Sequence, residues 1–256
     1  MKDWQAVFDE ERACVIVPTY NNERTIVDVL QRIRAYTRNV IVVNDGSTPA
    51  TMEVLTTAFD ASERPDIVDY TPNRGKGYAL MQGFRRALEL GYRYAVTIDS
   101  DGQHFPENIP AVMDCHLANK DALVVGSRNL TADNMPSRNT FANKFSNFWF
   151  RLQTGIPLED TQSGFRLYPL ENINLRWPIT PRYEAELELL VFSAWRGVPV
   201  VSVPVRVYYP PDDERVSHFR PFWDFFRITV LNSVLTIVSL FTFIPARLWK
   251  RVRVKV

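Results

Sequence analysis

The sequence predicts an α/β fold in which helices flank a mainly parallel sheet, followed by a C-terminal helix that associates with a membrane. Two observations lead to this expectation. Short runs rich in β-branched residues alternate with segments of helical periodicity through the first half of the chain, a pattern typical of βαβ units. A long segment without charged residues then follows at residues 228–246.

Size and composition agree with one folded body. The 256 residues suffice for one sizeable α/β domain and do not require two. Hydrophobic residues make up 46% and charged residues 23%, which is ordinary for a globular protein and argues against widespread disorder. The two cysteines, Cys14 and Cys115, lack metal-ligand spacing and are expected to be reduced packing residues.

The residue pattern in the first half of the chain predicts five strands with helices between them. In such sheets the ligand binds beyond the carboxyl ends of the strands, so functional residues are expected in the loops that follow. Two intervening segments carry apolar residues at helical spacing. The expected strands cover residues 13–18, 39–43, 66–70, 94–98 and 122–126, and the helical stripes are Ile26, Val29, Leu30 and Ile33, and Leu80, Met81, Phe84, Ala87 and Leu88.

The second half is less regular. Residues 130–180 are aromatic, polar and interrupted by prolines, so we expect a lid or acceptor region there. A helix is predicted at residues 183–197, ended by Gly197. An alternating strand with prolines typical of a sheet edge is predicted at residues 198–209.

The uncharged segment 228–246 would be about 28 Å long as a helix, close to the thickness of a bilayer core. Polar residues recur along it at roughly helical period, so they could face a partner helix inside a membrane or point away from a helix lying in the interface. A buried core helix is the alternative. The polar residues are Thr229, Asn232, Ser233, Thr236, Ser239 and Thr242.

Charge is unevenly distributed. Six basic residues follow the last acidic residue, Asp224, so a chain with net charge +1 carries −5 over its first 224 residues. A basic segment beside a hydrophobic one, with Trp249 between them, favours an anionic membrane over nucleic acid as the partner. The first twelve residues have no apolar run and are not expected to be a secretory signal. We therefore expect association with the cytoplasmic face of the inner (plasma) membrane.

Two carboxylates, Asp99 and Asp101, stand where an apolar strand is expected to end, in TIDSDGQH. In an extended chain these two side chains project to the same side. Magnesium is usually held by one or two carboxylates together with substrate phosphates, so this spacing predicts half of a metal–diphosphate site. The alternative is that both are loop acids that cap the following helix. Asp45, in a turn after the second strand, could accept hydrogen bonds from a base or ribose.

Six motifs occur in one order along the chain: VPTYNN (17–22), NDGS (44–47), NRGKGYA (73–79), DSDGQH (99–104), GSR (126–128) and DTQSGFR (160–166). Together they resemble the family 2 glycosyltransferases of GT-A fold, and most closely the polyprenol-phosphate sugar synthases typified by dolichol-phosphate mannose synthase. The resemblance covers residues 13–220. It implies a GT-A catalytic domain, which we place at residues 1–220. The uncharged segment and the basic residues after it predict a membrane-anchoring helix and tail at residues 221–256.

The resemblance also implies the chemistry. It points to inverting, metal-dependent transfer of a sugar from a GDP- or UDP-sugar to a lipid-linked acceptor, expected to be a polyprenyl phosphate. Mg²⁺ or Mn²⁺ is implied at Asp99, Asp101 and Gln103, and Arg128 is implied near the donor phosphates. The further implied ligand-binding positions are Pro18, Tyr20, Asn22, Asp45 and Lys76 for the donor, Arg138 for an acceptor phosphate, and Ser217, His218 and Arg220 in a late phosphate-binding motif. For Lys76 and Arg138 a solvated surface cation is the alternative.

Two positions depart from the family pattern. An acid is usual where Asn22 stands, so either Glu23 replaces it through a shifted turn or that contact is lost. A lysine is common where His218 stands. Because histidine is mostly neutral near pH 7, a weaker hold on phosphate is expected there.

Two mechanisms remain open at this stage. A lipid phosphate has a second pKa of about 6, so it supplies an ionised oxygen at neutral pH and needs no general base. A hydroxyl acceptor, in another envelope lipid or a polysaccharide, would need a base, and Asp160 stands at the position that family members use. Glu184 and Glu186 are interpreted as surface charges of a helix.

Other functional classes fit less well. A sugar-nucleotide pyrophosphorylase would need a glycine-rich, arginine-containing loop after the first strand, and a dinucleotide oxidoreductase would need G-x-G-x-x-G. Neither motif is present in the sequence. A catalytically silent, membrane-docked scaffold is the remaining alternative, and Asp45, Asp99, Asp101 and Arg128 argue against it. Self-association through the C-terminal helix is a further expectation.

Overall fold

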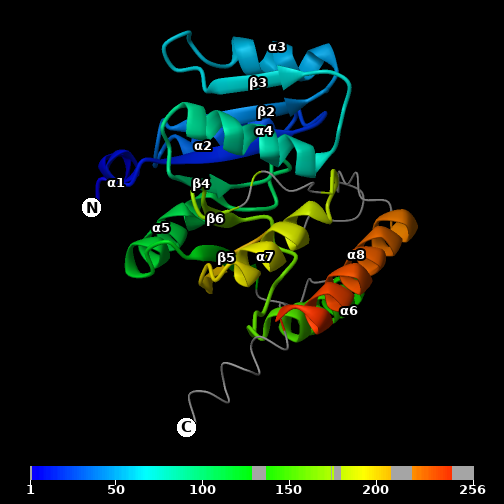
Figure 1. Cartoon of the computed structure of the whole chain (residues 1–256). Coiled ribbons are helices and arrows are strands. Elements are labelled where there is room, and N and C mark those ends of the chain that lie inside the picture. Colours follow the sequence, from blue (N-terminus) through cyan, green and yellow to red (C-terminus); the bar gives the residue numbers. More distant parts are fainter. Residues whose placement is uncertain (1, 129–136, 174, 176–179, 209–220, 244–256) are drawn as a thin grey trace.

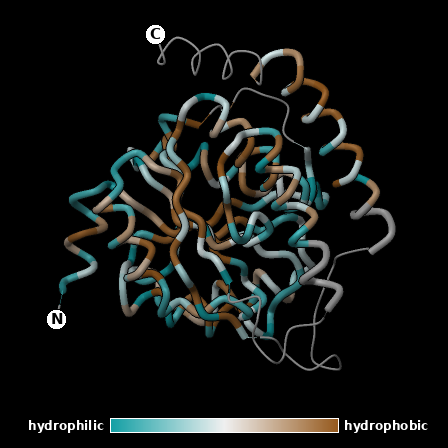
Figure 2. Tube along the Cα trace, turned by 90° about the horizontal axis from the view of Figure 1, so that it is seen from below, coloured by the Kyte–Doolittle hydropathy of each residue, from teal (hydrophilic) through white to brown (hydrophobic). Residues whose placement is uncertain are grey.

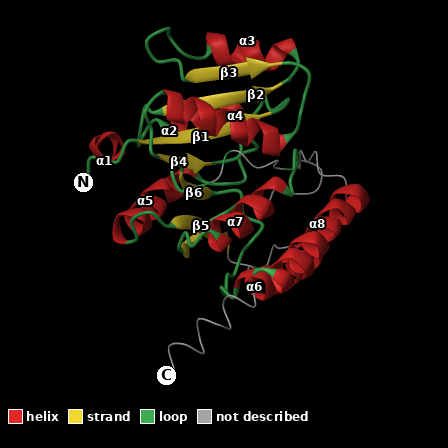
Figure 3. Ribbon diagram, in the orientation of Figure 1, coloured by secondary structure: helices red, strands yellow, loops and turns green. Residues whose placement is uncertain are grey.

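The computed structural model describes residues 2–128, 137–173, 175, 180–208 and 221–243 (Figure 1). For residues 137–142 and 221–225 it describes the backbone alone. In this part of the chain a central sheet is covered by helices on both faces (Figure 3). The predicted α/β fold is therefore confirmed.

The sheet has seven strands in the order β3-β2-β1-β4-β6-β5-β7. Neighbouring strands are parallel except at β6, which runs antiparallel to both β4 and β5. The prediction of a mainly parallel sheet is thus confirmed. The strands are β1 (Ala13–Thr19), β2 (Val40–Asp45), β3 (Asp66–Tyr70), β4 (Tyr94–Thr97), β5 (Leu123–Arg128), β6 (Arg166–Pro169) and β7 (Val200–Val205).

Alternation along β1 divides the core between the two faces of the sheet. Cys14 and Ile16 belong to one hydrophobic cluster, whereas Val15 and Val17 belong to the other, because successive side chains of a strand point to opposite faces. Every residue of β1 is buried, as expected for a strand with helices on both sides. Figure 2 shows the hydrophobic segments that run through the centre of the molecule.

Four helices supply apolar side chains to the cluster that contains Val15. The cluster that contains Ile16 receives them from two inner helices, and from two outer helices through Phe150 and Leu235. Two long helices lie outside this second layer, against α7 and each other. A short 3₁₀ helix, η1 (Pro106–Asn108), leads into α5. The first group is α1 (Trp4–Glu10), α2 (Ile26–Ile33), α3 (Pro49–Thr57) and α5 (Ile109–Ala118), the second is α4 (Lys76–Glu89) and α7 (Ala185–Trp195), and the outer pair is α6 (Ser137–Thr154) and α8 (Pro221–Phe241).

The expectation of an irregular region at residues 130–180 was wrong in two places. An 18-residue helix, α6, occupies Ser137–Thr154, and β6 adds a buried strand. The aromatic residues Phe145, Phe148 and Trp149 have helical spacing, but part of the apolar surface of α6 is exposed, so the segment does not read as an ordinary amphipathic helix. β6 begins with the charged Arg166, so the sequence pattern did not indicate that this strand is fully buried.

The C-terminal helix begins at Pro221, where the predicted anchor segment begins. Among the described residues there is no helix with both the length and the apolar character needed to cross a membrane. Three of the six polar residues predicted to form a stripe, Asn232, Thr236 and Ser239, hydrogen-bond to Gln153 of α6. These three residues therefore face a helix of the same chain, whereas Ser233 and Thr242 of the predicted stripe are exposed. The boundary between a catalytic domain and an anchor at residue 220 stays a prediction.

Candidate active site

A cleft of about 650 Å³ opens at the carboxyl ends of β1, β2 and β4. Because β1 lies between β2 and β4 in the sheet, the chain leaves this point in opposite directions, which is where α/β sheets bind ligands. The cleft brings together nine of the predicted site residues. They are Pro18, Tyr20, Asn22, Asp45, Lys76, Asp99, Asp101, Gln103 and Arg128.

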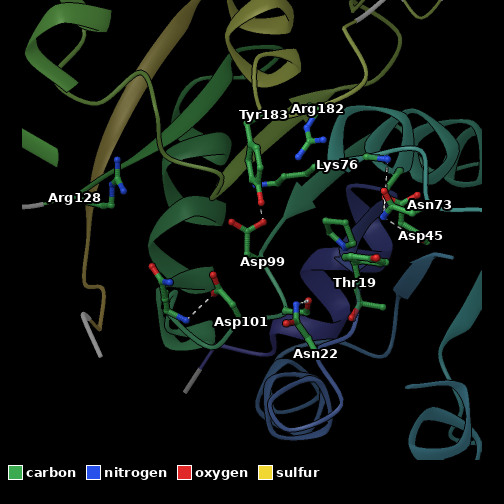
Figure 4. Close-up of a pocket in the computed structure, with 16 residues that line it drawn as sticks. Thr19, Asn22, Asp45, Asn73, Lys76, Asp99, Asp101, Arg128, Arg182 and Tyr183 are labelled. Atoms are coloured by element: carbon green, nitrogen blue, oxygen red, sulfur yellow. Dashed lines mark hydrogen bonds and ion pairs between the residues drawn. The ribbon is translucent and has the colours of Figure 1, made fainter. Parts of the chain in front are cut away.

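Asp45 ends β2 at one side of the cleft (Figure 4). Its carboxylate accepts hydrogen bonds from the backbone N–H groups of Arg74 at 2.7 Å and Gly75 at 2.8 Å, and from Asn73 Nδ2 at 2.9 Å. Burial raises the pKa of Asp45, although these donors act in the opposite direction. Asp45 therefore fixes the loop that leads into α4, in addition to lining the cleft.

Gly46 makes the close approach of these two loops possible. Its φ is +65°, and a Cβ at this position would lie 2.4 Å from the backbone nitrogen of Asn73. A side chain would therefore collide with a rigid backbone atom in a conformation that L-residues rarely adopt. The NDGS motif requires glycine here for steric reasons.

Asn22 takes the position in the cleft that the family pattern gives to an acid. Its Nδ2 donates to Ser100 Oγ at 2.7 Å, which ties the loop after β1 to the loop after β4. Glu23 does not replace it, because its carboxylate accepts a hydrogen bond from Thr51 Oγ1 at 3.3 Å and does not line the cleft. Of the two alternatives, the structure therefore excludes the shifted turn.

Lys76 lies inside the site between two carboxylates. Its Nζ is 2.7 Å from Asp99 Oδ1 and 3.0 Å from Glu186 Oε2. Burial alone would lower the pKa of Lys76, but the two negative charges raise it overall. The alternative that Lys76 is a solvated surface cation is excluded.

Glu184 and Glu186 are not surface charges, and that interpretation was wrong. Both are buried, as is Glu188 on the same helix. Apart from these acids α7 is largely apolar, and its residues 185–191 are all buried, so each acid needs an internal partner. Glu186 pairs with Lys76, Glu184 with Arg227 at 2.7 Å, and Glu188 accepts a hydrogen bond from the Thr180 N–H at 2.6 Å.

The two aspartates of the DSDGQH motif have different protonation behaviour. Burial would raise the pKa of Asp99, but the charge of Lys76 and then of other neighbours lowers it. Burial and the negative charge of Asp99 raise the pKa of Asp101 to about 6, despite a 2.9 Å hydrogen bond from the Gln103 N–H. Asp101 is therefore a half-buried acid that forms no ion pair within the part of the chain that the structure describes.

Arg128 lies on the other side of Asp99 from Asp45 (Figure 4). It is held by Asp160, whose two carboxylate oxygens accept from Arg128 Nε at 2.6 Å and Nη2 at 2.9 Å. Asn143 Nδ2 donates to the same carboxylate at 2.6 Å. Burial would raise the pKa of Asp160, but Arg128 and Asn143 lower it overall. Asp160 is fully buried and does not line the cleft.

A match to a family model decides the family. The model described as Glycosyl transferase family 2 matches residues 14–170, more than half of the chain. The chain belongs to glycosyl transferase family 2. It is therefore an enzyme of the glycosyltransferase class that uses a nucleotide-sugar donor, and the sequence-based assignment is confirmed.

Curated family 2 glycosyltransferases align over most of their length. The chain is 30% identical over 213 residues to the polyprenol monophosphomannose synthase of Mycolicibacterium smegmatis, with 80% of each protein covered. It is 28% identical over 213 residues to the UDP-N-acetylglucosamine–dolichyl-phosphate N-acetylglucosaminyltransferase of Methanococcus voltae, covering 76% of this chain and 85% of the relative.

A solved structure has the same fold. Glucosyl-3-phosphoglycerate synthase from Mycobacterium tuberculosis, in complex with Mn²⁺, UDP and phosphoglyceric acid, superposes with a TM-score of 0.65 at 20% identity, covering 92% of this chain and 81% of that one. At this identity the similarity supports the GT-A-like fold alone.

The side chains that this glycosyltransferase offers as metal ligands fit a hard divalent cation. Among the described residues, no group of three or more His, Cys, Asp and Glu side chains could enclose a metal. Two neighbouring carboxylates open to a cleft instead suit Mg²⁺ or Mn²⁺, which share their remaining ligand positions with phosphate and water. Burial, and after it the negative charge of Asp99, raise the pKa of Asp101, and a bound cation would act in the opposite direction by favouring the ionised carboxylate.

Several site residues were missed from the sequence, and several predicted ones cannot be placed. Thr19, Asn73, Arg182 and Tyr183 also line the cleft. Thr19 and Asn73 lie inside two of the recognised motifs, whereas Arg182 and Tyr183 precede α7 and carry no motif signal. The predicted ligands Ser217, His218 and Arg220 lie outside the described residues, as does the side chain of Arg138.

Proposed function

We propose that this family 2 glycosyltransferase catalyses the metal-dependent, inverting transfer of a sugar from a nucleoside diphosphate sugar to a polyprenyl phosphate. One observation carries the proposal. A single cleft at the switch point of the sheet holds the Asp99–Asp101 pair between a loop fixed by Asp45 and the cation Arg128. A nucleoside at the Asp45 end places its diphosphate beside the aspartates and the arginine.

The metal site consists of Asp99 and Asp101, with Gln103 beside them. A bound Mg²⁺ or Mn²⁺ supplies electrostatic stabilisation of the charge that develops on the departing diphosphate. Arg128 supports the same charge from the opposite side, and Asp160 and Asn143 fix its guanidinium. Because these groups are positioned before the donor binds, little reorganisation accompanies the reaction.

The sugar of the donor lies next to Lys76 and Glu186 in this proposal. Within the described residues, Glu186 Oε1 is buried and has no hydrogen-bond partner. A buried acceptor of this kind costs free energy unless a donor reaches it, and a sugar hydroxyl is a suitable donor. Glu186 does not itself line the cleft, whereas Lys76 does, so the hydroxyl approaches Glu186 past Lys76 in this proposal. Gly164 packs closely against this pair, since a Cβ there would lie 2.8 Å from Lys76 Nζ and 3.0 Å from Glu186 Oε1.

The state of Asp160 supports a phosphate acceptor. Its carboxylate is engaged by Arg128 and Asn143 and has a lowered pKa, so it is a poor acceptor for the proton of an attacking hydroxyl. A lipid phosphate is already ionised near pH 7 and needs no such base. The names of two relatives, a polyprenol monophosphomannose synthase and a dolichyl-phosphate N-acetylglucosaminyltransferase, support the same acceptor class.

We also propose that the enzyme works at the cytoplasmic face of the plasma membrane, where a cytosolic donor and a lipid-borne acceptor meet. Residues 221–256 provide the contact with the membrane in this proposal, and self-association through α8 remains a prediction. The relatives use different sugars, as their names state. Both GDP- and UDP-sugars therefore belong in the assay.

The test is a transfer assay with purified full-length protein in detergent. Radiolabelled GDP- and UDP-sugars are each offered with a polyprenyl phosphate or with the same polyprenol lacking the phosphate, in Mn²⁺, in Mg²⁺ or in EDTA. We expect label in the lipid phase only with the phosphate-bearing lipid and a divalent cation. Transfer to the free polyprenol at a similar rate would favour the hydroxyl acceptor, and equal transfer in EDTA would contradict the metal requirement.

A further inference from the structure

The inner side of the C-terminal helix α8 combines apolar and polar groups, because Leu235 is buried in the core and polar side chains beside it bind α6. Gln153 Nε2 of α6 donates to the Asn232 carbonyl at 3.1 Å and to Thr236 Oγ1 at 3.0 Å, and Ser239 Oγ donates to the Gln153 carbonyl at 2.8 Å. Asn232 and Ser239 are buried. The polar stripe is therefore used by contacts within the chain.

The opposite side of α8 is apolar and exposed. Phe241 is 79% exposed and Ile237 57% exposed, whereas side chains of this size are normally buried. Val230, Val234, Ile237 and Phe241 are all exposed and follow one another at intervals of four, three and four residues, which places them in one stripe along the helix. With two exposed apolar residues of the adjacent α6, they form what we call the α6–α8 face. Its members are Phe148, Leu152, Phe226, Val230, Val234, Ile237, Val238, Leu240 and Phe241.

The position of α8 is fixed relative to the rest of the protein. Trp195 of α7 stacks on Phe243 at 4.3 Å between ring centroids, and its Nε1 donates to the Gln153 carbonyl at 3.1 Å. α6 and α8 pack against each other; Figure 1 shows α8 on the outside of the molecule, and Figure 2 shows its hydrophobic segments at the rim. The exposed apolar stripe is thus part of a defined surface, and such surfaces on soluble domains mark interaction sites.

The charge of the neighbouring sequence identifies the partner. After α8 the chain carries five basic residues and no acidic one. An apolar helix face followed by Lys and Arg is the arrangement by which helices lie in the interface of an anionic bilayer. A second copy of the chain would present basic residues to basic residues, so it offers no matching charge.

We propose that the α6–α8 face is a membrane-docking surface, on which the enzyme lies on an anionic bilayer with α8 parallel to the membrane plane. The apolar stripe enters the interface, while Asn232, Thr236 and Ser239 stay turned toward Gln153. The two helices form this surface together, so docking extends beyond the C-terminal segment predicted from the sequence.

The docking surface also lies close to the cleft. Arg227 of α8 pairs with Glu184 at 2.7 Å, and Glu184 directly follows Arg182 and Tyr183, which line the cleft. If the acceptor is a lipid phosphate, as the proposed function states, a bilayer on this face holds its head group near the donor. This step rests on the acceptor named in the proposed function, whereas the docking surface is argued from α6 and α8 and does not depend on the acceptor.

The test is flotation of the full-length protein with vesicles of phosphatidylcholine, with or without phosphatidylglycerol. The test variant is Val234→Gln/Ile237→Gln, and the matched control is Leu88→Gln/Leu90→Gln, which alters two exposed apolar residues at the end of α4. Glutamine keeps helix propensity, and circular dichroism checks the fold of both variants. We expect the test variant to bind anionic vesicles about tenfold more weakly or worse, because two apolar side chains leave the interface, and the control to bind like the wild type.

Three results discriminate between the possibilities. Wild-type vesicle binding by Val234→Gln/Ile237→Gln would overturn the proposal. A second contradicting result comes from sedimentation equilibrium. If the wild type is a dimer and Val234→Gln/Ile237→Gln is a monomer with unchanged flotation, the face is a contact between copies and the proposal is overturned. If flotation depends on the face but no sugar is transferred to any polyprenyl phosphate, the proposed function fails and the docking surface stands.

Discussion

At the scale of single residues, Asp99 and Asp101 are two residues apart but have opposite electrostatic surroundings. Lys76 compensates Asp99 at 2.7 Å, whereas Asp101 has a backbone hydrogen bond and a raised pKa. A proton on Asp101 competes with a metal ion because only the ionised carboxylate binds the cation well. The geometry of the pair therefore makes metal binding depend on pH.

We predict that the affinity for Mn²⁺ with a nucleoside diphosphate rises as the pH increases through about 6, the pKa of Asp101. Below this pKa Asp101 is protonated and must lose its proton on binding, whereas above it the carboxylate is free to bind. Isothermal titration on both sides of this pH, in buffers of different ionisation enthalpy, measures affinity and proton release together. Asp101→Asn should abolish the proton release. An affinity that is constant across this interval in the wild type would contradict the assignment of Asp101 as a metal ligand.

Asp160 is the residue whose expected role changes most once its surroundings are known. We predict that Asp160→Asn lowers the free energy of unfolding by about 3 kcal/mol, as when one partner of a buried ion pair is removed. The lowered pKa implies that this contribution is present above the ordinary pKa of an aspartate, about 4, and is lost as the pH falls through the folded value. Urea unfolding near pH 7 and at acid pH measures both effects.

The matched control is Glu159→Gln, the exposed neighbour of Asp160, which should unfold like the wild type. Sugar transfer by Asp160→Asn adds a mechanistic test. Near-normal turnover would exclude Asp160 as an essential base, and unchanged stability would show that the Arg128–Asp160 pair does not act as described.

At the scale of elements, the start of α4 is pressed against the segment that precedes α7. A Cβ on Gly77 would lie 2.3 Å from the Thr180 carbonyl oxygen and 2.4 Å from Ala185 Cβ. This contact sets the distance between Lys76 on one helix and Glu186 on the other. A methyl group at residue 77 would therefore separate the two elements that form the site.

We predict that Gly77→Ala lowers the free energy of unfolding by about 1–3 kcal/mol, the usual cost of overpacking, despite the higher helix propensity of alanine. Donor binding should weaken as well, because Lys76 moves relative to Glu186. Arg85→Ala, at an exposed position of the same helix, is the control and should have neither effect. A Gly77→Ala protein with wild-type stability and donor affinity would show that this packing does not position the site.

The strands of the first half were predictable because their signal is local. β1 and β2 are runs of buried apolar residues between polar loops, and β3 was predicted with its observed ends at residues 66 and 70. β6 was missed because Arg166 breaks the apolar pattern. Its guanidinium is satisfied by the carbonyl groups of Thr161, Ser163 and Glu186, contacts that appear only after distant segments have met.

At the scale of the whole molecule, α7 connects the cleft with the α6–α8 face. The segment before α7 lines the cleft, and α6 packs on α7 and on α8. The residues after β1, β2 and β4 were predictable because the carboxyl ends of parallel strands meet at one edge of a sheet. Glu186 was misread because its burial depends on α4 and β6 packing around α7. Likewise, the polar stripe of α8 was visible in the sequence, but its partner Gln153 lies 79 residues from Asn232.

The most direct test of the central claim is a crystal structure of the protein with Mn²⁺ and a nucleoside diphosphate, UDP or GDP, in separate crystals. The account predicts an anomalous manganese peak between the Asp99–Asp101 pair and the diphosphate, with the nucleoside toward Asp45 and Arg128 on the phosphate side. A diphosphate bound elsewhere, or a metal that contacts neither aspartate, would contradict it.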